Sequence, residues 1–456
     1  MAKKSSKFKC VNCGYETIKY MGRCTNCGKF GTLEEVVEDT IKKQHENSIR
    51  GVDNSKALNK VSSTLSNRLI TGISEFDRVL GGGLVEDSIS IISAPPGTGK
   101  STLLLQVCSS LAEQGLSVLY ATGEESENQV KRRADRILDN ISDNIKIVSD
   151  NCMDNVITSI EKSDAKFIII DSIQAMALST IASKIGSPTQ VIGCANELTK
   201  MAKNNENPRC IIIICQMTKE DELSGPRTLE HLVDTVLILD GTDELKSLSS
   251  TKNRFGELDT GFFTMTGDKG LEEVSNPSQF FMTEREVGEE VSGSALCVVR
   301  EGIRPILLEI ESSTSKSYAP YPSRLAEGFR KDQLNILVSI LEQRAGINLW
   351  NENVIVRTTG AMKINETSVN LAILMSIASS YYKKPIPNKT IFIGEVGLTG
   401  ELKKVVALES RIKEAERMGF ERVIVPNQNI RLDLDFLNIK VIKQKTIKST
   451  IQYIWQ

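Results

Sequence analysis

The feature that most constrains the fold of this chain is the segment SAPPGTGKSTLLLQ, at residues 93–106. A glycine-rich loop that ends in Gly-Lys-Ser and connects a strand to a helix forms a phosphate-binding P-loop. The preceding residues predict a strand from Ser88 to Ser93, and the following residues predict an apolar helix from Lys100 to about Gln114. This pattern predicts an α/β core that binds a nucleotide.

The loop residues have the chemistry that phosphate binding needs. The predicted nucleotide-binding residues are Gly97, Thr98, Gly99, Lys100, Ser101 and Thr102. Backbone amides of the loop can surround the β-phosphate, Lys100 can reach the β and γ oxygens, and Ser101 can ligate magnesium. Ala94 replaces the first glycine of the usual pattern and adds one methyl group there. Because the other glycines and the Lys-Ser pair remain, we predict that the loop binds ATP with Mg2+.

Three further segments place polar residues at the ends of predicted strands. LSVLYATGEES ends in Glu124 and Glu125, and a carboxylate at this position can orient and deprotonate the attacking water. AKFIIIDSIQAM carries Asp171 at the end of a buried strand, and Asp171 is expected to hold magnesium through a bound water. PRCIIIICQMTK ends near Gln216, which could sense the γ-phosphate. Alternating strands and helices imply a parallel sheet that binds its ligand at the carboxyl ends of the strands.

Four of the ten cysteines lie within the first 27 residues. Cys10 and Cys13 form one Cys-x-x-Cys pair, and Cys24 and Cys27 form the second. This spacing predicts a closed, structural four-thiolate zinc site, and zinc would stabilise a module too small to bury its own core. Two disulfides or free thiols are the alternative. The remaining six cysteines are expected to be small buried hydrophobic residues.

The motifs of the chain and the changes in composition along it predict four segments. These are a four-cysteine zinc finger at 1–31, a polar linker at 32–66, a P-loop ATPase domain at 67–275 and an α+β C-terminal domain at 276–456. The formal net charge of -2 means that any nucleic-acid surface must be local. Apolar runs are too short to cross a membrane, and the basic start lacks the apolar stretch of a secretory signal, so a cytoplasmic protein is expected.

Several motifs in one order resemble the bacterial RadA (Sms) family. They are GISEFDRVLGGGLV, GEES, SGPRTLEHLVDTVLILDG and KNRFG, the last at residues 252–256. The resemblance implies a RecA-like hexameric motor that hydrolyses ATP at subunit interfaces, binds single-stranded DNA and drives branch migration of recombination intermediates. It further implies that Glu124 is the general base, and that Lys252 and Arg254 reach the neighbouring subunit's γ-phosphate or couple hydrolysis to DNA. A RecA-type recombinase is a possible partner.

The chain departs from the family pattern at Ala94, at Gln216, where relatives often have histidine, and before KNRFG, where an expected arginine is missing. DNA contacts are predicted in two loops, at residues 178–190 and 219–227. The candidate DNA-binding residues are Lys184, Lys219 and Arg227. Because of the departures at Ala94, at Gln216 and before KNRFG, an ATP-switched DNA-binding scaffold with little turnover is an alternative function.

The C-terminal third resembles the Lon-protease-like domain of the same family, through TTGAMKINETSVNLAILMSIASS and IFIGEVGLTGELKKVVALESRIKEAERMGF. Aligning these motifs puts Ser368 at the peptidase serine position and Glu409 at the lysine position. An ATP-dependent peptidase is therefore an alternative, but glutamate is a weak base for a serine. We expect a non-proteolytic scaffold, which could present a basic face to duplex DNA through Arg330, Lys331 and Arg344.

Overall fold

The computed structural model describes residues 7–10, 13, 15–17, 21–29, 33–36, 68–204, 206–216, 229–242, 244–285, 289–431 and 437–455. The chain divides into two compact units, residues 1–64 and 65–456. Apart from residues 33–36, the predicted linker at 32–66 lies outside the described residues.

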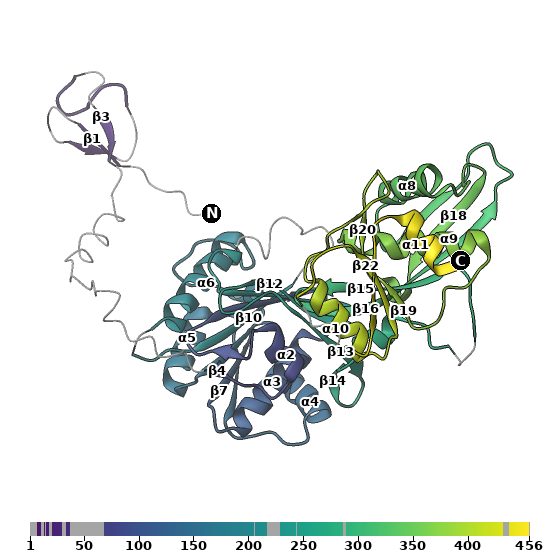
Figure 1. The fold of residues 1–456 in the computed structure, drawn as a ribbon. Helices are drawn as coiled ribbons and strands as arrows, with labels where there is room; N and C mark the ends of the chain where they lie inside the picture. Colours follow the sequence, from purple (N-terminus) through teal and green to yellow (C-terminus); the bar gives the residue numbers. More distant parts are fainter. Residues whose placement is uncertain are drawn as a thin grey trace. The chain divides into compact units, whose positions relative to one another are not determined.

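The first unit contains a small antiparallel sheet in the order β2-β1-β3 (Figure 1). Its strands are β1 (Lys7–Cys10), β2 (Glu16–Thr17) and β3 (Leu33–Val36). Strand β3 pairs with β1 along its whole length, although it lies in the range predicted as linker. The sheet of the cysteine module therefore includes residues beyond position 31.

After the short strand pair β4 (Arg68–Leu69) and β5 (Leu84–Val85), the second unit forms a nine-stranded sheet in the order β14-β13-β12-β11-β6-β10-β9-β7-β8. Its strands are β6 (Ile89–Ala94), β7 (Val118–Thr122), β8 (Ile145–Ser149), β9 (Phe167–Asp171), β10 (Cys210–Gln216), β11 (Thr235–Gly241), β12 (Lys246–Asn253), β13 (Thr260–Thr266) and β14 (Gly270–Glu273). Strands β11, β6, β10, β9, β7 and β8 run parallel, which confirms the predicted parallel sheet. Three antiparallel strands, β12 to β14, extend one edge.

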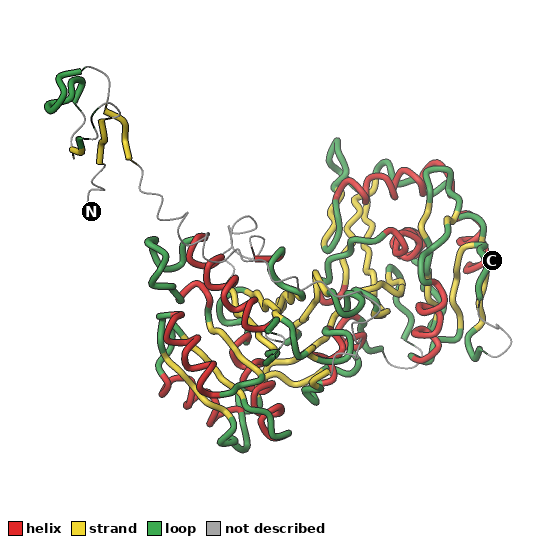
Figure 2. Tube along the Cα trace, turned by 90° about the vertical axis from the view of Figure 1, so that its left-hand side faces the viewer, coloured by secondary structure: helices red, strands yellow, loops and turns green. Residues whose placement is uncertain are grey.

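Helices cover both faces of this sheet (Figure 2). They are α2 (Ser74–Val79), α3 (Lys100–Glu113), α4 (Glu127–Ile137), α5 (Met153–Ser163) and α6 (Pro188–Ala202). Apolar residues of α2, α3 and α4 pack with Ile169 and Ile212, whereas those of α5 and α6 pack with Ile168 and Ile213. Because alternate residues of a strand point to opposite faces, isoleucine-rich strands buried on both sides are what this layered core requires.

A seven-stranded sheet in the order β17-β18-β16-β15-β19-β22-β23 follows. Its strands are β15 (Ser294–Glu301), β16 (Arg304–Lys316), β17 (Arg324–Glu327), β18 (Glu352–Thr358), β19 (Thr390–Phe392), β22 (Arg422–Pro426) and β23 (Lys440–Gln444). The helices are α8 (Lys331–Ile340), α9 (Asn370–Tyr382), α10 (Leu408–Arg417) and α11 (Ile447–Trp455). This mixture of parallel and antiparallel strands with helices agrees with the α+β class expected for the C-terminal third. The boundary at 275/276 stays a prediction.

Cysteines outside the first unit lie mostly in the core. Cys108, Cys194, Cys210, Cys215 and Cys297 are buried, and Cys152 is half-buried. Burial raises the pKa of Cys210 and of Cys215 to about 12, so these thiols stay protonated and behave as small apolar groups. Among the helices in the described ranges, none combines the length and the apolar character needed to span a membrane.

Candidate nucleotide site and metal centre

The P-loop joins the buried strand β6 to helix α3, as predicted. Gly97 and Gly99 have φ angles of 80° and 104°, a region that favours glycine. A Cβ atom at Gly99 would lie 2.9 Å from Leu271 Cδ1, so a side chain at this position would also require Leu271 to shift. Ala94, by contrast, is the last residue of β6, pairs with Gln216 and is fully buried in the core beneath α3. The strand conformation at Ala94 accommodates its methyl group, so the departure from the glycine pattern leaves the loop intact.

Lys100 is the first residue of α3, directly after the loop, and is 8% exposed. Its Nζ donates to the carbonyl oxygens of Ala94, at 2.8 Å, and Pro95, at 3.1 Å. Burial lowers the pKa of Lys100, while the nearby carboxylates of Asp171 and Glu124 oppose this shift. A buried ammonium group is stabilised by a nearby anion, so this arrangement suits a bound phosphate.

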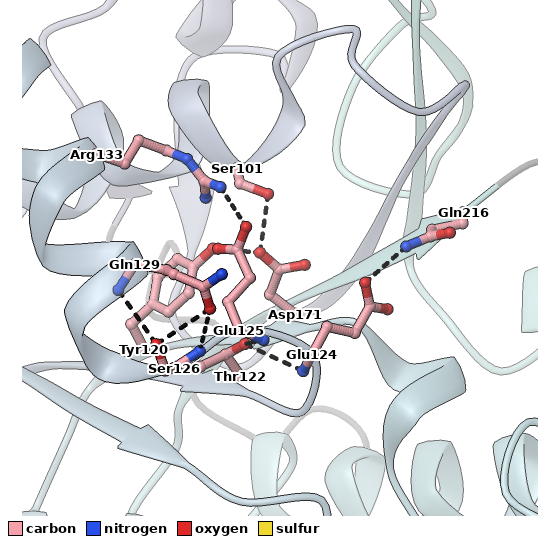
Figure 3. A network of polar contacts seen from close by, with 10 residues as sticks. All are labelled: Ser101, Tyr120, Thr122, Glu124, Glu125, Ser126, Gln129, Arg133, Asp171 and Gln216. Carbon is pink, nitrogen blue, oxygen red and sulfur yellow. Dashed lines mark hydrogen bonds and ion pairs between the residues drawn. The ribbon is translucent and has the colours of Figure 1, made fainter.

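Ser101 and Asp171 form the pair that could hold magnesium. Ser101 Oγ donates to Asp171 Oδ2 at 2.8 Å, and the buried Tyr120 hydroxyl donates to the same oxygen (Figure 3). Burial raises the pKa of Asp171, and the two hydrogen bonds oppose the shift by stabilising the carboxylate. A hydroxyl oxygen and a carboxylate beside a phosphate loop are the hard oxygen ligands that Mg2+ prefers, so these residues fit the ion.

The adjacent residues Glu124 and Glu125 have different partners (Figure 3). Glu124 Oε2 accepts a hydrogen bond from Gln216 Nε2 at 2.8 Å, and its Oε1 accepts from the Ser172 hydroxyl. Glu125 instead forms an ion pair with Arg133 of α4. Glu124 therefore lies between the ends of β9 and β10, whereas Glu125 is held against the next helix.

A cavity of about 360 Å3 brings most of the predicted nucleotide-site residues together, a size within the range of about 300–1,000 Å3 typical of ligand pockets. Its lining includes Lys100, Ser101, Glu124, Asp171 and Gln216. Arg133 and Arg136 of α4 also line it, and the sequence reasoning missed both. Two arginines three residues apart on the helix that follows GEES were the available signal, since such residues share one helix face.

The KNRFG segment lies at the other end of the sheet from the P-loop. Asn253 pairs with Thr235 at the start of β11, and Thr235 pairs with Ser90 near the start of β6, whereas the P-loop follows the end of β6. Lys252 Nζ donates to the carbonyl oxygen of Val233 at 2.8 Å, and burial lowers the pKa of Lys252. Arg254 pairs with Asp234 at 3.1 Å. The structure therefore does not bring Lys252 and Arg254 to the P-loop of their own chain.

The predicted DNA-contacting residues are only partly described. Lys184 is exposed in the loop that precedes α6. Lys219 and Arg227 lie outside the described residues. All three stay predictions.

The four N-terminal cysteines converge on one point. The sulfur atoms of Cys10, Cys13, Cys24 and Cys27 all lie within 4.8 Å of one another. The Sγ–Sγ distances are 3.7 Å for Cys10 and Cys27 and 3.6 Å for Cys13 and Cys24. Since a disulfide bond is about 2.05 Å long, these are separate thiol groups arranged as a tetrahedral metal site requires.

Ser368 is 6% exposed, and its Oγ accepts a hydrogen bond from the guanidinium of Arg411 at 3.0 Å. A guanidinium cannot accept the proton of a serine nucleophile. Arg411 is fixed by an ion pair with Glu366 at 2.6 Å. Glu409, at the position of the peptidase lysine, accepts from the backbone N–H of Arg431 at 3.2 Å. The geometry around Ser368 is that of a structural polar network.

The suggested basic face of the C-terminal third is largely engaged in local contacts. Arg330 forms an ion pair with Asp332, and Arg344 Nε donates to the carbonyl oxygen of Leu398 at 3.0 Å. Lys331 is exposed at the start of α8. A duplex-DNA surface here stays a prediction.

Family models match three parts of the chain. Residues 8–35 match a rubredoxin metal binding domain, residues 55–198 an AAA domain, and residues 329–429 the subunit ChlI of Mg-chelatase. The first match covers the four-cysteine cluster, and the module binds zinc. The second contains the P-loop, which binds ATP together with Mg2+.

Curated relatives match almost the whole chain. The DNA repair protein RadA of Bacillus subtilis is 41% identical, with 94% of each chain covered. The protein of the same name from Campylobacter jejuni is 38% identical, with 100% of each chain covered. Among solved structures, a KaiC-like protein from the archaeon Pyrococcus horikoshii is 21% identical at a TM-score of 0.39, covering 46% of this chain and 99% of that one.

Proposed function

Because the chain belongs to the RadA family of DNA repair proteins, we propose that it is a DNA-dependent ATPase motor that processes recombination intermediates. The observation that carries this proposal is the convergence of Lys100, Ser101, Asp171 and Glu124 on one cavity at the carboxyl edge of the parallel sheet. In the proposed assembly, a homo-hexameric ring binds single-stranded DNA and promotes branch migration in the cytoplasm. A RecA-type recombinase is a proposed partner.

Four residues of the cavity, together with the loop amides, carry out this mechanism. Lys100 and the loop amides hold the β- and γ-phosphates, and Ser101 with Asp171 would hold magnesium. When bound, magnesium neutralises charge that develops on the phosphate oxygens. Glu124 orients the attacking water and accepts its proton.

Gln216 supplies a physical connection between this site and DNA. Its side chain donates to Glu124, and the predicted DNA-contacting segment at 219–227 begins three residues later in the chain. A shift of that segment on DNA would move the hydrogen-bond donor of the general base. We infer that DNA stimulates hydrolysis by aligning Glu124 through Gln216.

The test is steady-state ATP hydrolysis with and without single-stranded DNA, with Lys100→Ala as the blank. We expect DNA to increase the rate in the unmodified protein and to have no effect on Lys100→Ala. Stimulation would identify a DNA-coupled motor that tolerates Ala94. ATP binding without turnover in either condition would contradict the motor and identify an ATP-switched scaffold.

The position of KNRFG predicts that each ATP site is completed by a neighbouring subunit. Arg254 lies at the sheet end remote from its own P-loop, and arginine suits the clamping of phosphate oxygens in trans. Lys100→Ala and Arg254→Ala are each expected to be inactive alone. Mixing the two variants under conditions that exchange subunits should restore part of the hydrolysis, because some interfaces then combine two intact half-sites.

Mixing Lys100→Ala with Lys100→Gln is the matched control, since no interface in that mixture has an intact P-loop lysine. Hydrolysis that fails to recover in the first mixture, despite demonstrated subunit exchange, would show that Arg254 does not act across the interface.

A further inference from the structure

Tyr120 is a buried polar residue behind the nucleotide cavity, and none of the sequence motifs gives it a role. It lies on β7, is 1% exposed, and packs in the core beneath α3. Its hydroxyl donates to Asp171 Oδ2, the oxygen that also accepts from Ser101 (Figure 3). The Tyr120 hydroxyl therefore contacts the magnesium-binding pair from the interior of the protein.

The register of the sheet explains how this contact arises. Tyr120 pairs with Ile169 on the neighbouring strand β9, and Asp171 lies two residues further along β9. Residues two apart on a strand point to the same face, so Tyr120, Ile169 and Asp171 share one side of the sheet. The length of the tyrosine side chain carries its hydroxyl along that face to the carboxylate at the strand end.

We propose that Tyr120 is a positioning residue for magnesium, which fixes the Asp171 carboxylate next to Ser101 through its hydroxyl hydrogen bond. This inference rests on the proposed nucleotide site. A buried carboxylate needs hydrogen-bond donors, and a buried hydroxyl needs an acceptor, so the contact satisfies both groups. When Ser101 Oγ turns to the metal, Tyr120 remains as a donor that keeps the carboxylate in place. Outer partners of metal-binding groups act in this way in many proteins.

The decisive variant is Tyr120→Phe, which removes one oxygen and keeps the ring in the core. Mn2+ serves as a spectroscopic replacement for Mg2+, and its binding to the protein–ADP complex is measured by electron paramagnetic resonance. We expect the affinity for Mn2+ to fall about 10- to 100-fold, as is typical when an outer partner of a metal ligand is lost. Affinity for ADP without metal should stay unchanged, because the phosphate loop is intact. The Mg2+ concentration needed for half-maximal hydrolysis should rise in parallel.

Two comparisons make the result specific. Tyr382→Phe, in the C-terminal third, is the matched control for the loss of a tyrosine hydroxyl and should bind Mn2+ as the unmodified protein does. In an Asp171→Asn background, Tyr120→Phe should weaken metal binding much less than it does alone, because the carboxylate that it positions is gone. Thermal melting identifies any loss of folded protein, and a folded Tyr120→Phe with unchanged Mn2+ affinity would overturn the proposal.

An equal loss of affinity for ADP with and without metal would also overturn it, because the hydroxyl would then support the loop rather than the metal. The outcome is separable from that of the proposed function. Mn2+ binding that depends on Tyr120, in a protein whose hydrolysis ignores DNA, would keep the positioning role and remove the motor.

Discussion

Replacing Glu124 with glutamine is expected to lower the rate of ATP hydrolysis about 10²- to 10⁴-fold, the usual contribution of a positioned general base. Glutamine can keep a hydrogen bond to Gln216 but cannot accept a proton from water at neutral pH. Glu125→Gln is the matched control, because the two residues are adjacent and the substitution is the same. Glu125 is engaged by Arg133, so its loss should leave most of the hydrolysis rate.

Single-turnover hydrolysis and ATP binding, measured on both variants, separate chemistry from affinity. Glu124→Gln should still bind ATP, since it leaves Lys100 and the loop amides unchanged. A larger loss of hydrolysis in Glu125→Gln than in Glu124→Gln would contradict the assignment of Glu124 as the general base. Glu125 would then be the base, and Arg133 would have to release it.

Removal of zinc is expected to unfold the first unit and leave the second folded. Zinc binding in small structural sites supplies about 10–16 kcal/mol at neutral pH, and a module of this size has little other core. The hydrophobic cluster of the first unit is built on Cys10 and Cys24 themselves. Chelation should therefore release one equivalent of zinc and make the first unit sensitive to protease, while the melting temperature of the second unit stays unchanged.

Cys13→Ser removes one ligand and should reproduce the effect of chelation without a chelator. Cys152→Ser, a half-buried cysteine outside the cluster, is the control and should retain one zinc per chain. Full zinc retention by Cys13→Ser would show that the four thiols do not act as one site.

The nucleotide site could be predicted because its residues follow strands that are easy to recognise. Asp171, Gln216 and the P-loop each come after a run of β-branched residues, and parallel strands bring their carboxyl ends to one edge. Tyr120 and Arg133 could not be predicted in the same way. The contact of Tyr120 with Asp171 depends on the register of two strands, and the ion pair of Arg133 with Glu125 depends on which face of α4 points to the strand ends. The spacing of Arg133 and Arg136 indicates a shared helix face but not what that face contacts.

The outcomes at Ala94 and at KNRFG both depend on strand positions that the motifs themselves do not specify. Ala94 looked like a defect of the loop, but the last residue of a strand needs no glycine. KNRFG was recognisable as a motif, yet its distance from the P-loop follows from an antiparallel edge, β12 to β14, that hydrophobic periodicity did not reveal. A sequence motif identifies candidate residues, whereas the strand order determines which of them lie close together in one chain.

The central place of β6 has a consequence for how the chain becomes functional during synthesis. Both neighbours of β6 in the sheet, β10 and β11, come more than 100 residues later in the sequence, as the pairing of Ile89 with Ile211 shows. Closing such long loops is slow, because their entropy must be paid before the contacts form. When the ribosome has just completed the P-loop, the strands β10 and β11 that flank β6 have therefore not yet been made. The nucleotide loop is synthesised early but folds late, after residues near position 238 have left the ribosome and completed the sheet around it.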